Sequence, residues 1–183
     1  MNTETTFDNP RGRETREQTL PEVDSARRAT FARISRILVP TDFTEASEHA
    51  LGYATGLAAQ LGAMVVVCHV YQLPTPLAGA ELSTIPTPQA SLEIDQAARL
   101  GVNNSIARHA RDAVSFAAVV RPGDAELEIR TIAREVGADL IILGTHGRTG
   151  LMRIISGSVT DDVVHHADIP VLVLHGRHGS QSS

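Results

Sequence analysis

The chain has 183 residues, a formal charge of -5 at pH 7 and a sequence pI of about 5.9. This length suits one domain with a proper core, and the acidic balance excludes the basic surface typical of nucleic-acid binding. The 16 lysine and arginine residues are all arginine. The absence of lysine excludes the P-loop, the protein-kinase strand lysine and Schiff-base chemistry. Any bound phosphate must therefore contact backbone amides, hydroxyls or arginine.

Two features bear on location. Cys68 is the only cysteine and lies in the apolar run MVVVCHV, so we expect a buried thiol rather than a disulfide or a site of several thiolates. No apolar run approaches the ~20 residues that span a bilayer, and residues 1–20 lack the apolar stretch of a secretory signal. We therefore expect a cytoplasmic protein that does not contact the membrane.

The two ends of the chain differ from its middle. Residues 1–33 are polar without a sustained apolar period, which predicts a flexible leader and leaves open a short helix over 22–33. Residues 176–183 are interpreted as a flexible tail. The folded domain is expected to comprise residues 34–175.

Short apolar runs alternate with helical patterns through this domain. Valine- and isoleucine-rich runs predict strands at 36–41, 63–71, 113–120, 138–144 and 169–175. Helices are predicted at 44–61, 89–112 and 125–136, and from 157 or 158 to before 169, with Thr44 and Asp124 as N-caps. Such alternation implies right-handed crossovers. The expected class is α/β, with an open, five-stranded, mostly parallel sheet.

Two segments have competing interpretations. Residues 72–89 contain four prolines, which exclude a regular helix and leave either a surface insertion or a flap over a ligand. His165 and His166 fall in the last turn of the fourth helix. There they suit the helix dipole better than a shared metal site, because adjacent residues do not face each other on a helix.

The segment 143–159, LGTHGRTGLMRIISGSV, carries four glycines directly after an apolar run. Repeated glycine is costly on folding, so the segment needs a positive reason to exist. In an open parallel sheet, ligands bind outside the carboxyl ends of the strands. The same edge would hold Pro-Thr-Asp at 40–42 and His-Val at 69–70.

These residues resemble the universal stress protein family over nearly all of 34–175. The similarity is carried by RILVPTDFTEASEHAL, GDAELEIRTIAREVGADLIILGTHGRTG and SGSVTDDVVHHADIPVLVL. The most specific element is Gly144-x2-Gly147-x9-Gly157-Ser158, which matches the Gly-x2-Gly-x9-Gly-(Ser/Thr) pattern of the ATP-binding branch. The resemblance implies a Rossmann-like sheet of the adenine nucleotide alpha-hydrolase type, with helices on both faces and strand order 3-2-1-4-5.

The resemblance also implies a nucleotide site, in which bare main chain and a helix N-terminus hold an anion. Asp42 would accept from ribose hydroxyls or the adenine amine, and the backbone of Val70 would meet the adenine edge. The residues implied are Pro40, Thr41, Asp42 and Val70 around the adenosine, and Gly144, Gly147, Arg148, Gly157, Ser158 and Val159 around the sugar and phosphates.

Structural alternatives stand beside these roles. Asp42 could terminate a strand or cap the first helix, Ser158 could be only an N-cap, and His146 suits a solvent-facing loop residue better than a general base.

The expected function is a stress-response or signalling regulator that binds ATP, AMP or ADP, with or without Mg²⁺. It would act through nucleotide-dependent interactions. The alternatives are a slow ATP hydrolase or phosphotransferase, and a protein-interaction module without nucleotide. The resemblance further implies a homodimer through the last strand, Ile169 to His175, which would cover an exposed apolar edge.

Overall fold

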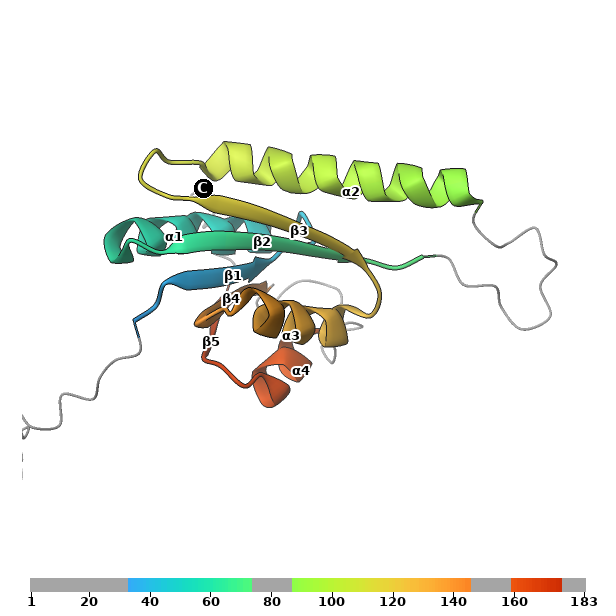
Figure 1. The fold of residues 1–183 in the computed structure, drawn as a ribbon. Coiled ribbons are helices and arrows are strands. Elements are labelled where there is room, and N and C mark those ends of the chain that lie inside the picture. The colour runs from blue at the N-terminus through green and yellow to red at the C-terminus, as the bar shows by residue number, and fades with distance from the viewer. Residues whose placement is uncertain (1–32, 74–86, 146–158, 176–183) are drawn as a thin grey trace, which may run out of the picture. The chain divides into compact units, whose positions relative to one another are not determined.

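The computed structural model describes residues 33–73, 87–145 and 159–175. Its sheet has five parallel strands in the order β3-β2-β1-β4-β5, so the predicted fold class and strand order are confirmed (Figure 1). The strands are β1 (Arg36–Pro40), β2 (Met64–Tyr71), β3 (Phe116–Pro122), β4 (Leu140–Thr145) and β5 (Val171–His175). The helices are α1 (Glu45–Leu61), α2 (Pro88–His109), α3 (Ala125–Val136) and α4 (Val159–His166).

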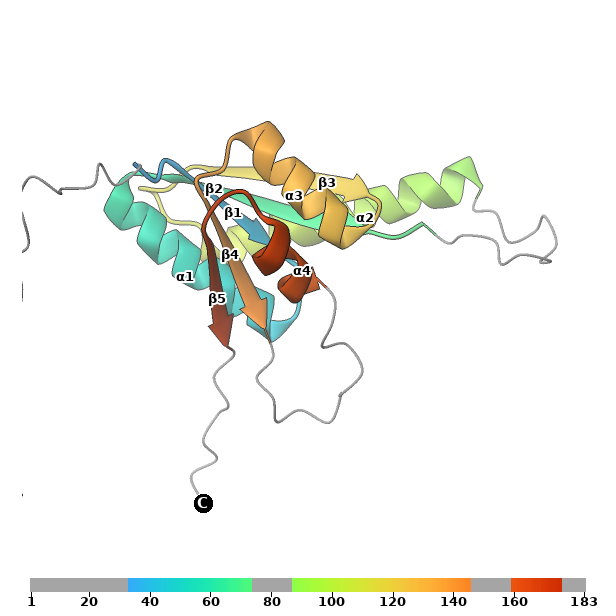
Figure 2. The same cartoon turned by 90° about the horizontal axis from the view of Figure 1, so that it is seen from below.

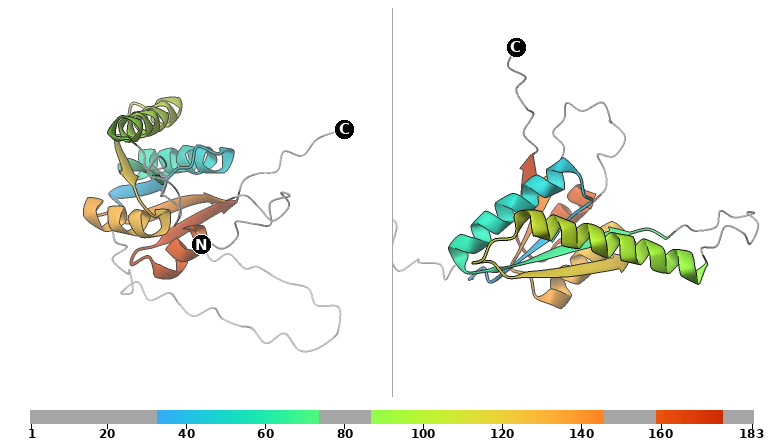
Figure 3. Two further views of the ribbon diagram at one scale, coloured as in Figure 1. Left: turned by 90° about the vertical axis from the view of Figure 1, so that its right-hand side faces the viewer. Right: turned by 90° about the horizontal axis from the view of Figure 1, so that it is seen from above.

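Helices cover both faces of the sheet. Helices α1 and α2 lie on one face, and α3 and α4 lie on the other, as the left view of Figure 3 shows. Successive strand residues point to opposite faces, so Ile37 and Val39 pack under α1 and α2 while Leu38 packs under α3 and α4. This two-sided burial explains why the strands are almost continuously apolar.

Local capping chemistry sets the helix ends. Thr44 is the N-cap of α1, and its side chain accepts a hydrogen bond from the Ser47 N–H. Asp124 caps α3 by accepting from two N–H groups of its first turn, so both predicted N-caps are confirmed. Gly62 and Gly137 end α1 and α3 in the left-handed conformation that favours glycine.

The strand boundaries differ from the prediction by up to three residues, and two of the differences have a clear local cause. Strand β3 begins at Phe116 rather than at 113, because the Val114 N–H donates to the Arg111 carbonyl in a turn that follows α2. Strand β5 begins at Val171 rather than at 169. Pro170 has no N–H to give to the ladder, although its carbonyl accepts from the Ile141 N–H.

The sheet reverses its winding direction at β1, which pairs with β2 on one side and β4 on the other. Figure 2 shows β4 and β5 side by side with their arrowheads at the same edge. A reversal of this kind opens a crevice at the carboxyl ends of the central strands. Among the described residues, no helix is long and apolar enough to cross a membrane.

Candidate functional site

A pocket of about 130 Å³ lies at the carboxyl ends of β1, β2 and β4. Five of the predicted site residues line it together: Pro40, Thr41, Asp42, Val70 and Gly144. The remaining lining residues are Ser47, Cys68, His69, Ala125, Ile129 and Leu143. Residues from four separate stretches of chain therefore meet at the winding reversal.

Thr41 fixes the loop that leaves β1. Its N–H donates to the Cys68 carbonyl at 2.8 Å, which prolongs the pairing with β2 by one residue. The Thr41 hydroxyl lies 3.1 Å from the Ser47 hydroxyl and accepts from the Phe43 N–H at 3.1 Å. Thr41 and Ser47 are both buried, so this polar contact sets the start of α1 against the end of β1.

Asp42 presents an ionised carboxylate at the pocket. Its Oδ1 accepts from the Thr44 N–H at 3.0 Å and from the Thr44 hydroxyl at 2.6 Å. Burial raises the pKa of Asp42, but the hydrogen bonds from Thr44 and Ser47 outweigh burial and hold the pKa below its ordinary value of 3.8. Asp42 thus braces Thr44, which is the N-cap of α1 in its place, and also supplies an acceptor that lines the pocket.

The backbone N–H and C=O of Val70 lie beyond the point where β1 ends. The Cys68 carbonyl points toward β1, where it accepts from Thr41, and residues two apart on a strand direct their backbone groups to the same side. Strand β1 ends at Pro40, opposite Cys68. The N–H and C=O of Val70 therefore point to the side on which β1 has already ended, while β3 pairs with the other side. This is the geometry of a strand edge open to a flat hydrogen-bonding partner.

Gly144 is required by a close approach of two backbones. A Cβ at this position would lie 2.0 Å from the Ala46 carbonyl oxygen and 2.9 Å from the Ser47 nitrogen. The amino-terminal turn of α1 therefore occupies the space beside Gly144 that we predicted for the sugar and phosphates. The bare backbone at Gly144 lets β4 and α1 meet beside the pocket.

The rest of the predicted phosphate site is only partly described. Val159 is the first residue of α4 and packs, partly buried, against the core under α3 and α4. The predicted residues Gly147, Arg148, Gly157 and Ser158, and the alternative base His146, lie outside the described residues.

The sequence analysis placed His69 at this edge of the sheet without assigning it a role, and it did not identify Ser47. The His69 Nδ1 lies 2.8 Å from the Thr41 carbonyl oxygen, and its ring lies 4.4 Å from the Phe43 ring between centroids. Ser47 stands three residues after the N-cap of α1, a position whose side chain faces back toward the preceding loop. That spacing was the available signal for Ser47, whereas the Phe43 contact depends on tertiary packing.

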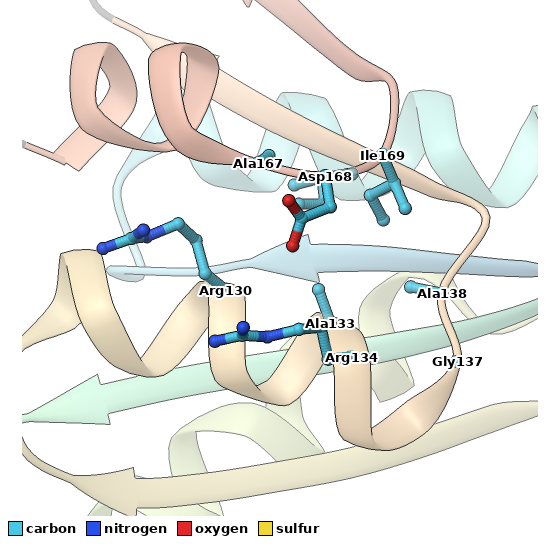
Figure 4. A pocket seen from close by; sticks show the side chains of 9 residues that line it. Arg130, Ala133, Arg134, Gly137, Ala138, Ala167, Asp168 and Ile169 are labelled. Atoms are coloured by element: carbon cyan, nitrogen blue, oxygen red, sulfur yellow. The ribbon is translucent and has the colours of Figure 1, made fainter.

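A second pocket, of about 260 Å³, lies at the opposite edge of the sheet. It is bounded by the end of α3 and by the segment that precedes β5, and Figure 4 shows the Asp168 carboxylate facing α3, which carries Arg130 and Arg134. Apolar side chains from Ala133 and Ile169 complete much of the wall. None of the predicted site residues that the structure describes lines this larger pocket.

Within the described part of the chain, no group of three or more His, Cys, Asp or Glu side chains could hold a metal ion.

The chain belongs to the universal stress protein family, whose family model matches residues 33–175. It is similar to the universal stress protein MJ0577 of Methanocaldococcus jannaschii, with 31% identity over 76% of this chain and 93% of that protein. A solved structure of MJ0577 superimposes with a TM-score of 0.65 and 28% identity, covering 80% of this chain and 99% of that one.

Two further structures of the same fold were solved with an adenine nucleotide bound. A universal stress protein in complex with cAMP matches with a TM-score of 0.52 and 19% identity, over 80% of this chain and 100% of that one. An Arabidopsis thaliana family member with AMP bound matches with a TM-score of 0.52 and 14% identity, over 81% of this chain and 97% of that one. At these identities, the matches show the shared fold alone.

Proposed function

We propose that this universal stress protein binds an adenine nucleotide, ATP, ADP or AMP, in the pocket at the carboxyl ends of β1, β2 and β4. It then acts as a stress-response or signalling regulator whose interactions depend on the nucleotide. The observation that carries the proposal is the meeting of Asp42, Val70 and Gly144 in one pocket, at the edge where open parallel sheets bind ligands.

The chemistry of the pocket suits an adenosine. An ionised Asp42 accepts hydrogen bonds from hydroxyl or amine donors, and the outward backbone of Val70 offers one donor and one acceptor to a base edge. The pocket is also lined by apolar side chains, Ile129 and Leu143 among them, which suit a flat aromatic base. In a chain without lysine, the glycine motif from Gly144 to Ser158 is the sequence feature from which we expect main-chain amides for the phosphates.

Isothermal titration with ATP and AMP tests this proposal. We expect Asp42→Ala to weaken binding about tenfold, which corresponds to about 1.4 kcal/mol, and Gly147→Val to weaken ATP binding at least as much by adding bulk to the motif. The matched control is Asp168→Ala, which removes a carboxylate from the other pocket. The titrations are run with and without Mg²⁺, because Mg²⁺ is usually held by phosphates and water rather than by a protein cage.

Equal affinities of the wild type and of Asp42→Ala would remove the assignment of the pocket. No heat from any nucleotide with the wild type would remove nucleotide binding itself and favour a protein-interaction module. Multiple turnovers of ATP by the wild type would instead favour the alternative of a slow hydrolase.

We further propose that β5 pairs with its counterpart in a second copy of the chain. Strand β5 is an edge of the sheet, and an unpaired edge is a template for another strand. Pro170 directs its carbonyl to β4, so the backbone of Val171 and Val173 points outward by the alternation along the strand. Val173→Pro removes an outward N–H and spares the ladder to β4. We expect light scattering to show a dimer for the wild type and a folded monomer for Val173→Pro. A variant that remains a dimer would exclude this edge as the interface.

A further inference from the structure

Phe43 has an unusual backbone for a bulky residue. Its φ of 64° makes it the one residue other than glycine with a positive φ among the described residues. Side chains of this size avoid the left-handed region, and strained positions of this kind gather at functional sites. The residue directly follows Asp42, and its N–H is held by the Thr41 hydroxyl. The loop that carries Asp42 into the pocket therefore depends on a strained conformation at Phe43.

The Phe43 ring joins the pocket wall to helix α2. On one side it lies 4.4 Å from the His69 ring, centroid to centroid, and His69 lines the pocket. On the other side it fills the space above Gly101 of α2, where a Cβ would lie 2.8 Å from the tip of the ring. Phe43 as a whole residue stays 39% exposed, so burial alone is a weak reason to hold a strained residue here.

A second contact, one turn further along α2, fixes the position of this helix relative to α1. The buried Ser105 hydroxyl donates to Glu48 Oε1 of α1 at 2.6 Å. Arg108 and His109 reach the same carboxylate at 2.6 Å and 2.9 Å. Because Gly101 and Ser105 are four residues apart, they lie on one stripe of the helix. The polar cluster around Glu48 thus holds Gly101 against Phe43.

We propose that Phe43 is a positioning residue through which helix α2 sets the orientation of Asp42 and of the wall formed by Thr41 and His69. This inference rests on the proposed nucleotide site, and it makes the nucleotide affinity depend on the position of α2. A displacement of α2 moves the ring, the ring moves the strained loop, and the loop moves the carboxylate that accepts from the nucleotide. The alternative is that Phe43 only helps to pack α2 and has no effect on binding.

The test is a double-mutant cycle on Phe43 and Gly101. Gly101→Ala drives a methyl group into the tip of the ring, and because that tip is the far end of a side chain, the ring moves while the fold persists. We expect Gly101→Ala to weaken AMP binding at least threefold by titration. In the Phe43→Gly background, where no ring is present to be displaced and glycine suits the backbone, we expect Gly101→Ala to have no further effect.

The matched control is Gly56→Ala in α1, where an added Cβ meets no atom within 4 Å. We expect it to leave AMP affinity unchanged. A nucleotide-free readout accompanies the titrations: the His69 ring signals in NMR, which the Phe43 ring current shifts. We expect these signals to move in Gly101→Ala and to remain in place in Gly56→Ala.

The outcomes separate the two proposals. If the wild type binds no nucleotide, the proposed function is wrong and this inference falls with it. If the wild type binds and Gly101→Ala shifts the His69 signals but leaves the affinity unchanged, the contact is only structural and this inference alone is overturned. Additive losses in the double variant would overturn it equally, because independent effects show that the helix does not act through Phe43.

Discussion

The pocket at the amino ends of β4 and β5 has about 260 Å³, twice the roughly 130 Å³ of the pocket at the carboxyl ends of β1, β2 and β4. Yet the smaller pocket contains the residues whose chemistry suits a nucleotide. Its wall includes the carboxyl ends of β1, β2 and β4, whereas the larger one is bounded by the end of one helix and the segment that precedes a strand. We therefore base the proposed site on where the strands end rather than on the volume of the cavity.

The sharpest expected difference between the two pockets concerns thiol reactivity. Cys68 lines the smaller pocket, but burial raises the pKa of its thiol from 9.0 to about 12. At a given pH near neutrality, this lowers the reactive thiolate fraction about a thousandfold. Asp168→Cys places an exposed thiol on the larger pocket. In this variant, we expect a soluble thiol reagent at pH 8 to label position 168 at an ordinary rate and Cys68 only after unfolding.

Equal labelling rates at positions 68 and 168 in the folded protein would contradict this prediction. Such a result would mean that the smaller pocket opens down to the Cys68 sulfur.

The two pockets also differ in how closely backbones approach. Gly144→Ala would push a Cβ into the backbone of α1, and we expect a loss of about 3 kcal/mol or more in the free energy of unfolding. Gly137, at the larger pocket, has a φ of 62°, but an added Cβ there meets only the flexible end of Arg36. We therefore expect Gly137→Ala to cost about 1 to 2 kcal/mol for the left-handed conformation alone.

Urea denaturation of these two variants measures the difference, with Gly56→Ala as the control. That change adds a methyl group in open space within a helix, and we expect it to raise stability by about 0.5 to 1 kcal/mol. A Gly144→Ala protein as stable as Gly137→Ala would mean that β4 and α1 can separate at little cost.

The smallest expected effect concerns acid stability beside the smaller pocket. Burial raises the pKa of Glu48, but Arg108, Ser105 and His109 outweigh burial and lower the pKa below its ordinary value of 4.5. A group with a lowered pKa in the folded state stabilises the protein above its unfolded-state pKa, and this stability is lost as the pH falls through the folded-state value. We expect Glu48→Gln to cost about 1 kcal/mol at pH 7 and to flatten the fall in stability below about pH 4.5.

Glu45→Gln is the control for that measurement, because Glu45 is exposed and lies in the same amino-terminal region of α1. Parallel stability curves for the wild type and Glu48→Gln between pH 3 and 7 would show that the cluster around Glu48 does not hold α2 through its charge.

Local physics made much of this fold readable from the sequence. The valine-rich runs gave strands because both faces of the sheet are covered, and Thr44 and Asp124 capped helices because their side chains accept from nearby N–H groups. Pro40, Thr41, Asp42, Val70 and Gly144 could be placed in one pocket because parallel strands end at one edge. The acidic and lysine-free composition decided by itself that a phosphate must be held by amides, hydroxyls or arginine.

Tertiary structure decided what depends on distant neighbours. Gly144 had an apparent ligand-binding reason in the sequence, but the Ala46 backbone proved to be what occupies its space. The outward backbone of Val70 follows from where β1 ends, and the contact of Phe43 with Gly101 joins residues that share no local pattern. Helical periods and caps act within a few residues of chain, whereas close approaches are set by how whole helices and strands pack. For that reason, the sequence indicated the edge of the sheet where the candidate site lies, and only the folded chain showed which contacts position its residues.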